Sequence, residues 1–428
     1  MYIAMGGAIL LAALIGAPLF AVILAAAMLG FHGQEVPLSV ITIELYRITD
    51  TPLLSALPLF TFTGYLLAEG NTSSRIVRLT SAFFGWMPSG LALVSLLTCA
   101  FFTAFTGASG VTIVAIGALL LPALTKAQYS ERFSLGLITT SGSLGLLLPP
   151  SLPLILYGII AQQMGYGEEV QIKTLFLAGL MPAALMILML ALYSFWANRD
   201  NPAPLTPFSW GEAWDALKEA RWEIPMPIFV LGGIYGGYFA VSEAAAATAL
   251  YVLIMELFLY KEITTKELPG IMQKSMVVVG GILLILGVSL AFTNFLVDAE
   301  VPTQLFELIQ THIDDKLTFL ILLNIILLLL GAILDIFSAI VIMVPLLLPV
   351  AIGYDIHPIH LGIIFLANMQ IGYFTPPVGM NLFIASYRFN KPITELYRAT
   401  LPYMFVLMAA VLIITFVPEL TFFFINDE

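Results

Sequence analysis

The sequence predicts an all-α polytopic membrane protein arranged as an inverted repeat, with two re-entrant hairpins and two broken helices. Composition is the first reason: 60% of the 428 residues are hydrophobic and 10% are charged, whereas a soluble protein carries about 25% charged residues. The apolar runs are continuous rather than alternating, which excludes a membrane β-barrel. Proline pairs interrupt two of these runs, at Pro149–Pro150 and at Pro376–Pro377.

A spanning helix needs about 20 apolar residues, and several segments of the chain meet this requirement. The first run lacks a basic region before it and is too long for a cleaved signal, so we expect a retained first helix. The predicted spans are 2–30, 51–69, 134–162, 174–197, 224–240, 243–260, 275–297, 360–387 and 400–424.

Two further apolar stretches, about 90–125 and 318–350, differ from these spans. Each is interrupted at its centre, by Gly107–Gly110 and around Gly331–Asp335, which leaves two short arms on either side. Arms this short predict re-entrant hairpins, which enter and leave the membrane on the same side. Two full helices would give the same sidedness, so charge does not separate these two options.

Lys and Arg concentrate in cytoplasmic loops, which assigns a side to each connector. With a cytoplasmic N-terminus, only Arg47, Lys173 and Lys316 fall outside, which leaves 13 of the 16 Lys and Arg residues inside. The acidic stretch 298–315 and the C-terminal tail fall outside. We therefore expect a multi-pass membrane protein with its N-terminus in the cytoplasm and its C-terminus on the opposite side of the membrane.

The two halves of the chain repeat each other at a fixed offset. Subtracting 227 from 349, 372, 376 and 377 gives 122, 145, 149 and 150, and each pair holds the same residue type, proline or glycine. By the charge distribution the first hairpin enters from the cytoplasm and the second from outside, so the halves are inverted. One odd helix must then separate them, and residues 224–240 supply it.

The proline pairs indicate where such a protein would bind a ligand within the membrane. A proline in a helix interior costs about 3 kcal/mol or more, and unwound backbone within a membrane is tolerated only where it lines a protected cavity. Inverted repeats with discontinuous helices are typical of secondary transporters with a site at the bilayer midplane. Exposed carbonyls there suit a cation, and helix N-termini suit an anion.

The motifs themselves are similar to a known family. Six stretches carry the similarity, at 58–70, 105–124, 142–158, 232–247, 331–349 and 368–383. They resemble the large membrane subunit of tripartite ATP-independent periplasmic (TRAP) transporters, over nearly the whole chain. This resemblance implies a location in the bacterial inner membrane, with the C-terminus in the periplasm. Two departures occur, because relatives often have two serines where this chain has Ala108–Ser109, and often TEAAA where it has Ser242–Glu243.

The resemblance implies uptake of an organic carboxylate such as sialic acid or a C4-dicarboxylate, driven by a Na⁺ gradient. It also implies two partners, a periplasmic substrate-binding protein and a small four-helix membrane subunit, which is not fused to this chain. The implied mechanism is an elevator, in which a transport domain slides against a scaffold. The implied division is scaffold 1–89, transport domain 90–197, scaffold 198–317 and transport domain 318–428, with breaks at 149–151 and 375–379.

The first hairpin tip and the first break are the first candidate Na⁺ site. Na⁺ is a hard cation that takes about five or six oxygen ligands, so backbone carbonyls and the Ser109 hydroxyl are suitable donors. Close helix packing by small residues is the alternative explanation for the glycines. The candidates are Gly107, Ser109, Gly110, Gly145 and Pro149.

By the repeat, a second Na⁺ site would use Gly331, Asp335, Gly372, Thr375 and Gly379. Asp335 is the only acidic residue deep in the second hairpin, and an intramembrane carboxylate is a functional candidate by default. It could instead cap the second arm of that hairpin. No organic or metal cofactor is expected besides Na⁺ as the coupling ion.

Candidate substrate contacts follow the breaks, and each has a structural alternative. Ser151 could cap the next half-helix. Arg388 could lie at the cytoplasmic face only because basic residues are enriched there. Two further polar residues within spans, Asn324 and Asn368, are expected to bond helix to helix. The candidate substrate contacts are Pro150, Ser151, Pro377, Asn381 and Arg388.

The segment 209–222 places Trp210, Trp214 and Leu217 on one helical face, so we expect an amphipathic helix lying against phospholipid at the cytoplasmic interface. The net charge of −11 argues against nucleic-acid binding. The only cysteine, Cys99, lies in an apolar run, which excludes an internal disulfide.

Other function classes fit the sequence less well. The GASG stretch at 107–110 matches the motif of intramembrane serine proteases, but no histidine lies in a predicted span core to act as the base. An ion channel would not need the inverted two-domain plan. A Na⁺/carboxylate symporter of the same architecture that works without a binding protein remains an alternative.

Overall fold

The computed structural model describes residues 2–47, 51–167, 169–199, 207–313 and 315–425, and within these ranges all regular structure is helical. Among the described residues, seven helices are long and apolar enough to cross a membrane, and two bent pairs would raise that number to nine. The seven are Ser109–Lys126, Ile172–Ala197, Val241–Leu259, Leu268–Asp298, Lys316–Ile333, Ile336–Gly353 and Ile393–Phe416. The predicted all-α membrane fold is confirmed.

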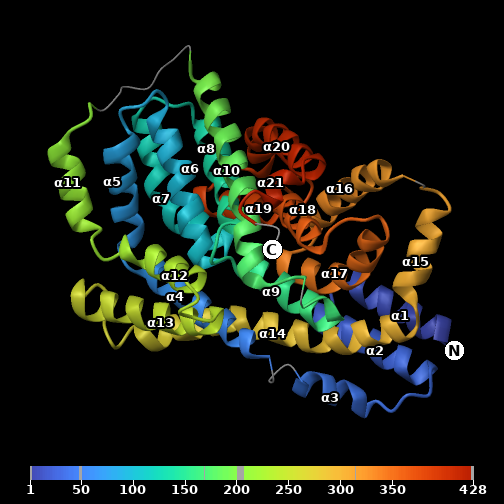
Figure 1. The fold of residues 1–428 in the computed structure, drawn as a ribbon. Coiled ribbons are helices and arrows are strands. Elements are labelled where there is room, and N and C mark those ends of the chain that lie inside the picture. The colour runs from blue at the N-terminus through green and yellow to red at the C-terminus, as the bar shows by residue number, and fades with distance from the viewer. Residues whose placement is uncertain (1, 48–50, 168, 200–206, 314, 426–428) are drawn as a thin grey trace.

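The offset of 227 seen in the sequence also relates the helices (Figure 1). Adding 227 to the bounds of α7 (Ser109–Lys126) gives those of α17 (Ile336–Gly353), and α6 (Gly90–Thr106) maps onto α16 (Lys316–Ile333) within one residue. The remaining pairs are α8 (Glu131–Ser141) with α18 (Pro358–Gly372), α9 (Leu152–Ala161) with α19 (Met380–Phe389), and α10 (Ile172–Ala197) with α20 (Ile393–Phe416).

Contacts between the halves come in reciprocal pairs. α9 packs on α17 and α19 packs on α7, while α10 packs on α18 and α20 packs on α8. In each pair, the two contacts use equivalent helices with the roles of the halves exchanged. Two units that contact each other in this way are related by a two-fold axis. How each unit faces the membrane stays a prediction.

Both predicted breaks lie where the prolines are. α8 ends at Ser141, a 3₁₀ turn η3 (Leu144–Leu147) follows, and α9 begins at Leu152. In the second half, α18 ends at Gly372 and α19 begins at Met380. The peptide bonds Pro149–Pro150 and Pro376–Pro377 are cis.

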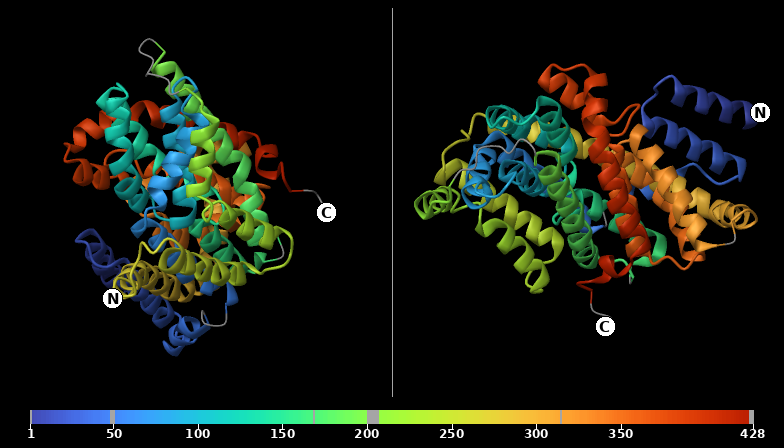
Figure 2. Two further views of the ribbon diagram at one scale, coloured as in Figure 1. Left: turned by 90° about the vertical axis from the view of Figure 1, so that its left-hand side faces the viewer. Right: turned by 90° about the horizontal axis from the view of Figure 1, so that it is seen from above.

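Two of the predicted spans are wrong. The segment 2–30 forms two short helices, α1 (Tyr2–Leu14) and α2 (Leu19–Gly33), which pack side by side (Figure 2). The chain turns at Gly16, whose φ of +94° favours glycine, just before Pro18. The segment 224–240 holds only α12 (Pro225–Tyr235), whose 11 residues reach about 16 Å.

These corrections remove the odd helix that the sidedness argument needed between the halves. Both segments are as apolar as expected. However, a backbone turn at a glycine divides 2–30 into two helices, and another ends the helix in 224–240. The cytoplasmic N-terminus and the inversion with respect to the membrane therefore stay predictions.

The helices outside the paired hairpins and breaks form a second group. α14 (Leu268–Asp298) is about 46 Å long at 1.5 Å per residue and, with α13 (Val241–Ile254), runs crosswise to α6, α7 and α8 in Figure 1. α4 (Ala56–Glu69), which follows the short turn η2 (Pro52–Ser55), packs on both α13 and α14. α3 (Ser39–Arg47), α15 (Val301–Gln310) and α21 (Glu419–Phe422) complete the described elements near the chain ends and connectors.

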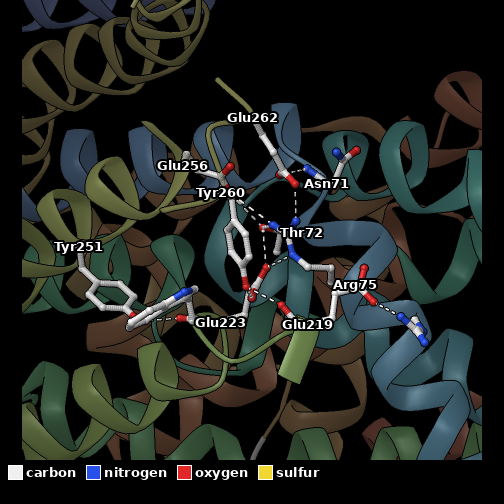
Figure 3. Close-up of polar contacts among 11 residues, drawn as sticks. Asn71, Thr72, Arg75, Glu219, Glu223, Tyr251, Glu256, Tyr260 and Glu262 are labelled. Carbon is white, nitrogen blue, oxygen red and sulfur yellow. Dashed lines mark hydrogen bonds and ion pairs between the residues drawn. The ribbon is translucent and has the colours of Figure 1, made fainter. Parts of the chain in front are cut away.

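A buried ion cluster fixes the elbow between α4 and α5 (Thr72–Phe84), which meet at 75° (Figure 3). The guanidinium of Arg75 is hydrogen-bonded to Glu223 and Glu262, and lies 3.9 Å from Glu256. Its Cζ also stacks 3.7 Å from the ring centre of Tyr260. One buried cation thus joins α5 to three carboxylates from distant segments.

The predicted interfacial helix is α11 (Trp210–Glu219), which packs against α5. Ala213 and Ala216 are buried, whereas Trp210 and Trp214, on the predicted apolar face, are exposed. Arg78 of α5 donates to Glu212 and Glu219 of α11. That these tryptophans meet lipid at the cytoplasmic interface stays a prediction.

Candidate functional site

Both hairpin tips line one cavity of about 710 Å³, which we call the hairpin cavity. The first tip contributes residues from Gly107 to Val111, and the second contributes Asp335 and Phe337. The second break adds Tyr373, and α19 adds Met380 and Ile384. The facing wall comes from α4 and α14, so the cavity lies between the two groups of helices.

The first tip turns at Gly107, whose φ is +62°. A Cβ on Gly107 would lie 2.4 Å from the Leu152 side chain at the start of α9, so the tip touches the first broken span. The hydroxyl of Thr103 lies 2.6 Å from that of Thr112 and donates to the carbonyl of Gly142 at 2.9 Å. The first tip and first break therefore meet, as the sequence predicts.

The break beside this tip is packed backbone to backbone. A Cβ on Gly145 would lie 2.2 Å from the carbonyl oxygen of Ala100 and 2.4 Å from the nitrogen of Ala104. Gly145, Pro149 and Pro150 are buried and do not line the hairpin cavity. Of the first candidate cation set, Gly107, Ser109 and Gly110 line the cavity.

Ser151 is the N-cap of α9. Its hydroxyl accepts from the nitrogen of Leu154 at 3.4 Å and donates to the carbonyl of Leu146. The structure therefore places Ser151 in the capping role, away from the hairpin cavity.

Asp335 both lines the cavity and caps α17. Its carboxylate accepts from the nitrogens of Phe337 at 3.1 Å and Ser338 at 3.0 Å, and from the Ser338 hydroxyl. The Tyr373 hydroxyl accepts from the nitrogen of Ile336 at 2.9 Å, which ties the second break to the second tip. A capping role and an electrostatic role are compatible here, because the carboxylate is only partly buried.

Contacts join four of the five residues of the second candidate cation set in two pairs. A Cβ on Gly379 would lie 2.8 Å from the carbonyl oxygen of Thr375 and 3.0 Å from that of Tyr373. The nitrogen of Gly379 donates to the carbonyl of Ala332 at 2.9 Å. Gly331 and Gly372 touch through their backbones, since a Cβ on Gly372 would meet the Gly331 carbonyl carbon at 2.3 Å. Several carbonyl oxygens thus converge at this break.

The candidate substrate contacts are dispersed. Asn381 is fully buried, and its Nδ2 donates to the carbonyl of Thr139 at 3.2 Å, while its Oδ1 has no partner among the described residues. Arg388 donates to the carbonyl of Val114, a cavity residue of α7, at 3.1 Å. The carbonyl of Pro377 accepts from Tyr397 at 2.5 Å. None of these three lines the hairpin cavity.

Sequence reasoning missed the facing wall of the cavity. Tyr65, Ala68 and Glu69 at the end of α4, and Val278 of α14, lie opposite the tips. Glu69 pairs with Lys274 of α14. Tyr373 lies inside the second proline motif, which was a usable signal, but nothing local marks α4 as a wall.

The predicted helix-to-helix bonds are confirmed: Asn368 Nδ2 donates to Asn324 Oδ1 at 2.7 Å. His360 bears on the protease alternative, because its ring nitrogens lie 2.8 Å from the Thr421 hydroxyl and 3.3 Å from the Thr415 carbonyl. A histidine bound to the C-terminal helices does not serve Ser109 as a base. Among the described residues, no group of three His, Cys, Asp or Glu side chains could hold a metal ion.

Comparison with known proteins identifies the family. Residues 4–420 match the family described as "Tripartite ATP-independent periplasmic transporter, DctM component". The chain is 33% identical over 399 residues to the isethionate TRAP transporter permease DctMQ of Oleidesulfovibrio alaskensis, which covers 91% of this chain and 61% of that longer protein. It is 32% identical to the C4-dicarboxylate TRAP transporter large permease DctM of Rhodobacter capsulatus, with 91% of each chain covered.

A solved structure supports the fold. The YdaH transporter of Alcanivorax borkumensis superposes with a TM-score of 0.56 at 15% identity, over 86% of this chain and 88% of that chain. The relatives are named as transporter permeases, so the chain is a multi-pass inner-membrane transporter subunit and not an enzyme. The chain belongs to the DctM-component family, the large permeases of tripartite ATP-independent periplasmic transporters.

Proposed function

We propose that this protein carries out Na⁺-coupled secondary active uptake of a small organic carboxylate across the bacterial inner membrane. The observation that carries the proposal is the hairpin cavity, in which two hairpin tips and the second break face helices α4 and α14. Secondary transporters bind substrate and coupling ions where such broken elements meet. Membership of this family supports a role in secondary transport of organic acids together with a binding protein.

The coupling ion is proposed to bind at the two tip-and-break junctions. At the second, the carbonyl oxygens of Tyr373 and Thr375 face Gly379, and Asp335, whose carboxylate is partly buried, lines the hairpin cavity together with Tyr373. Hard oxygen donors of this kind suit Na⁺, and a nearby carboxylate supplies the compensating charge. At the first, Ser109 and the carbonyls of Gly107, Gly145 and Pro149 are the corresponding candidates, with Gly110 beside them.

The substrate is proposed to be a carboxylate such as sialic acid or a C4-dicarboxylate. α7 begins at the cavity, at Ser109, without a side-chain cap, and helix N-termini attract anions. α17 also begins there, at Ile336, but Asp335 already caps its N-terminus. Relatives are named for a C4-dicarboxylate and for isethionate, a sulfonate, so the shared chemistry is a small organic anion.

Movement is proposed to follow an elevator mechanism. The scaffold would comprise 1–89 and 198–317, including α11, and the transport domain 90–197 and 318–428. In support, the cavity lies between these parts, and the Arg75 cluster ties α5 to Glu223 and Glu262 of the other scaffold segment.

Delivery by a periplasmic binding protein, with a small permease as the membrane partner, follows the family's organisation. The second candidate function is a binding-protein-independent Na⁺/carboxylate symporter, which the same cavity would also serve. Reconstitution decides between them. Uptake of a radiolabelled carboxylate panel is measured with and without the cognate binding protein and small permease.

We expect uptake to require external Na⁺ and the binding protein. Equal uptake with K⁺ in place of Na⁺ would contradict the coupling, and full uptake without the binding protein would favour the symporter. The cognate carboxylate is first found by thermal stabilisation of the binding protein against the panel.

A further inference from the structure

A second cavity, which we call the outer cleft, lies against the other end of α14. Its volume is about 300 Å³, and α14 lines it from Leu286 to Val297, whereas Val278 lines the hairpin cavity. Ser289 and Val278 are 11 positions apart, or about 16 Å along the helix. The opposite wall is formed by α17 and by the π-helix η4 (Gln162–Tyr166) after α9. Both cavities therefore lie along one scaffold helix.

The outer cleft has buried polar groups without protein partners. The Ser289 side chain is 4% exposed, and its hydroxyl has no hydrogen-bond partner among the described residues; the same holds for Oε1 of Gln163. Thr293 and Asn294 follow on the same stretch of α14. Leaving a buried donor or acceptor unpaired costs about 1–3 kcal/mol, so these groups favour a polar occupant.

The opposite wall adds backbone acceptors. Pro345 and Pro349 lie inside α17 and both line the cleft. A proline has no N–H to give to the carbonyl four residues earlier, which frees the carbonyls of Val341 and Pro345, two residues that also line the cleft. The cleft thus offers donors from one wall and acceptors from the other.

The mouth of the outer cleft carries an ion pair. An adjoining cleft of about 350 Å³ shares Gln163, Leu290 and Asn294 with the first and extends to Glu44 and Arg47. The Arg47 side chain is 68% exposed, and its guanidinium lies 3.7 Å from the Glu44 carboxylate. Among the described residues, no acidic or basic side chain lines the inner part. The predicted sidedness puts Arg47 on the periplasmic side, together with Lys173 and Lys316.

We propose that the outer cleft is a loading site, which binds the incoming solute on the Arg47 side before it reaches the hairpin cavity. The inference rests on the proposed function. The ligand class is a small carboxylate that also carries hydroxyl or amino groups. Its carboxylate would accept from Ser289, Thr293 and Asn294, and its own donors would reach Gln163 Oε1 and the freed carbonyls of α17.

Cysteine accessibility tests the placement. The sole cysteine, Cys99, is buried and is first replaced as Cys99→Ala. In that background Ser289→Cys is treated with a membrane-impermeant, anionic thiosulfonate added from outside to cells that also carry the small permease. Leu308→Cys on α15, 61% exposed, is the matched control away from the cleft. We expect labelling of both from outside, and several-fold slower labelling of Ser289→Cys alone when transported substrate is present.

Transport kinetics separate direct contact from a change of shape. Ser289→Ala and Asn294→Ala are expected to raise the KM for the solute several-fold with the Na⁺ dependence unchanged, and Asn294→Asp to raise it at least tenfold by repelling the anion. Unchanged KM in all three, or labelling of Ser289→Cys that substrate does not slow, would overturn the loading site while leaving coupled uptake intact. Loss of Na⁺ dependence in the unmodified protein would instead contradict the proposed function.

Discussion

Ser143 donates its hydroxyl to the backbone carbonyl of Gln370 at 3.1 Å, and the two residues are equivalent, because 370 minus 143 is 227. Equivalent positions of two symmetry-related units touch only near their symmetry axis. The two-fold axis that relates the two halves therefore lies close to this hydrogen bond. Together with the reciprocal packing of α9 on α17 and α19 on α7, it makes the two breaks a single joined core. Changes at one break should therefore affect the other.

The side chain of Gln370 lies in this core, is fully buried, and has no partner for either amide atom among the described residues. Replacing an unsatisfied buried amide by an apolar group of similar shape removes a desolvation cost of about 1–3 kcal/mol. We expect Gln370→Met to raise the Tm of the purified protein, measured by thermal unfolding in detergent. A lower Tm would mean that the amide is satisfied in the folded protein.

Gly145 and Gly372 should tolerate no larger residue. A Cβ at either position would lie within 2.3 Å of backbone atoms, of Ala100 and of Gly331 respectively. Overpacking against backbone costs about 1–3 kcal/mol or more. We expect Gly145→Ala and Gly372→Ala each to lower the Tm by several degrees, whereas Gly280→Ala on α14, where a Cβ meets nothing within 4 Å, leaves the Tm unchanged or higher.

The Arg75 cluster should dominate the stability of the α4–α5 elbow. Arg75→Met leaves Glu223, Glu256 and Glu262 without their cation, and removing one partner of a buried ion pair costs about 3–5 kcal/mol. Arg78→Met, whose ion pairs with α11 are exposed, should cost about 0–1 kcal/mol. Thermal unfolding of both variants side by side checks this, and equal losses would refute it.

Glu262 makes part of that stability dependent on pH. Burial alone would raise the pKa of Glu262, but the hydrogen bonds from Arg75 and from the Asn71 nitrogen outweigh burial and lower it. A carboxyl with a lowered pKa stabilises the fold fully above its unfolded value, and this stabilisation is lost as the pH falls through the folded value. We expect the Tm of the unmodified protein to fall more steeply below about pH 4.5 than that of Glu262→Gln. Parallel slopes would argue against this role.

Features of the fold that depend on local residue preferences could be predicted from the sequence. Prolines and glycines mark both breaks and both tips, and Asn324 and Asn368 were expected to bond helix to helix, although not specifically to each other. The turn at Gly16 and the early end of α12 were missed, because apolar length alone does not reveal where a glycine takes a positive φ. The Arg75 cluster and the wall at Glu69 could not be predicted, since their partners lie 148 to 205 residues away in the chain.

Asp335 is the residue whose two roles can be separated most cleanly. Asp335→Asn keeps an oxygen to accept from Phe337 and Ser338, and asparagine caps helices as well as aspartate does, so only the charge is lost. If the carboxylate balances a bound cation, the Na⁺ concentration for half-maximal uptake should rise about tenfold or more while the Tm stays within a few degrees. Asp315→Asn is the matched control, because Asp315 caps α16 in the same way, through the Thr318 nitrogen at 2.8 Å, but is exposed and away from the cavity. Since the control alters the same chemistry at a helix start, an equal Na⁺ response in both variants would assign Asp335 to capping alone.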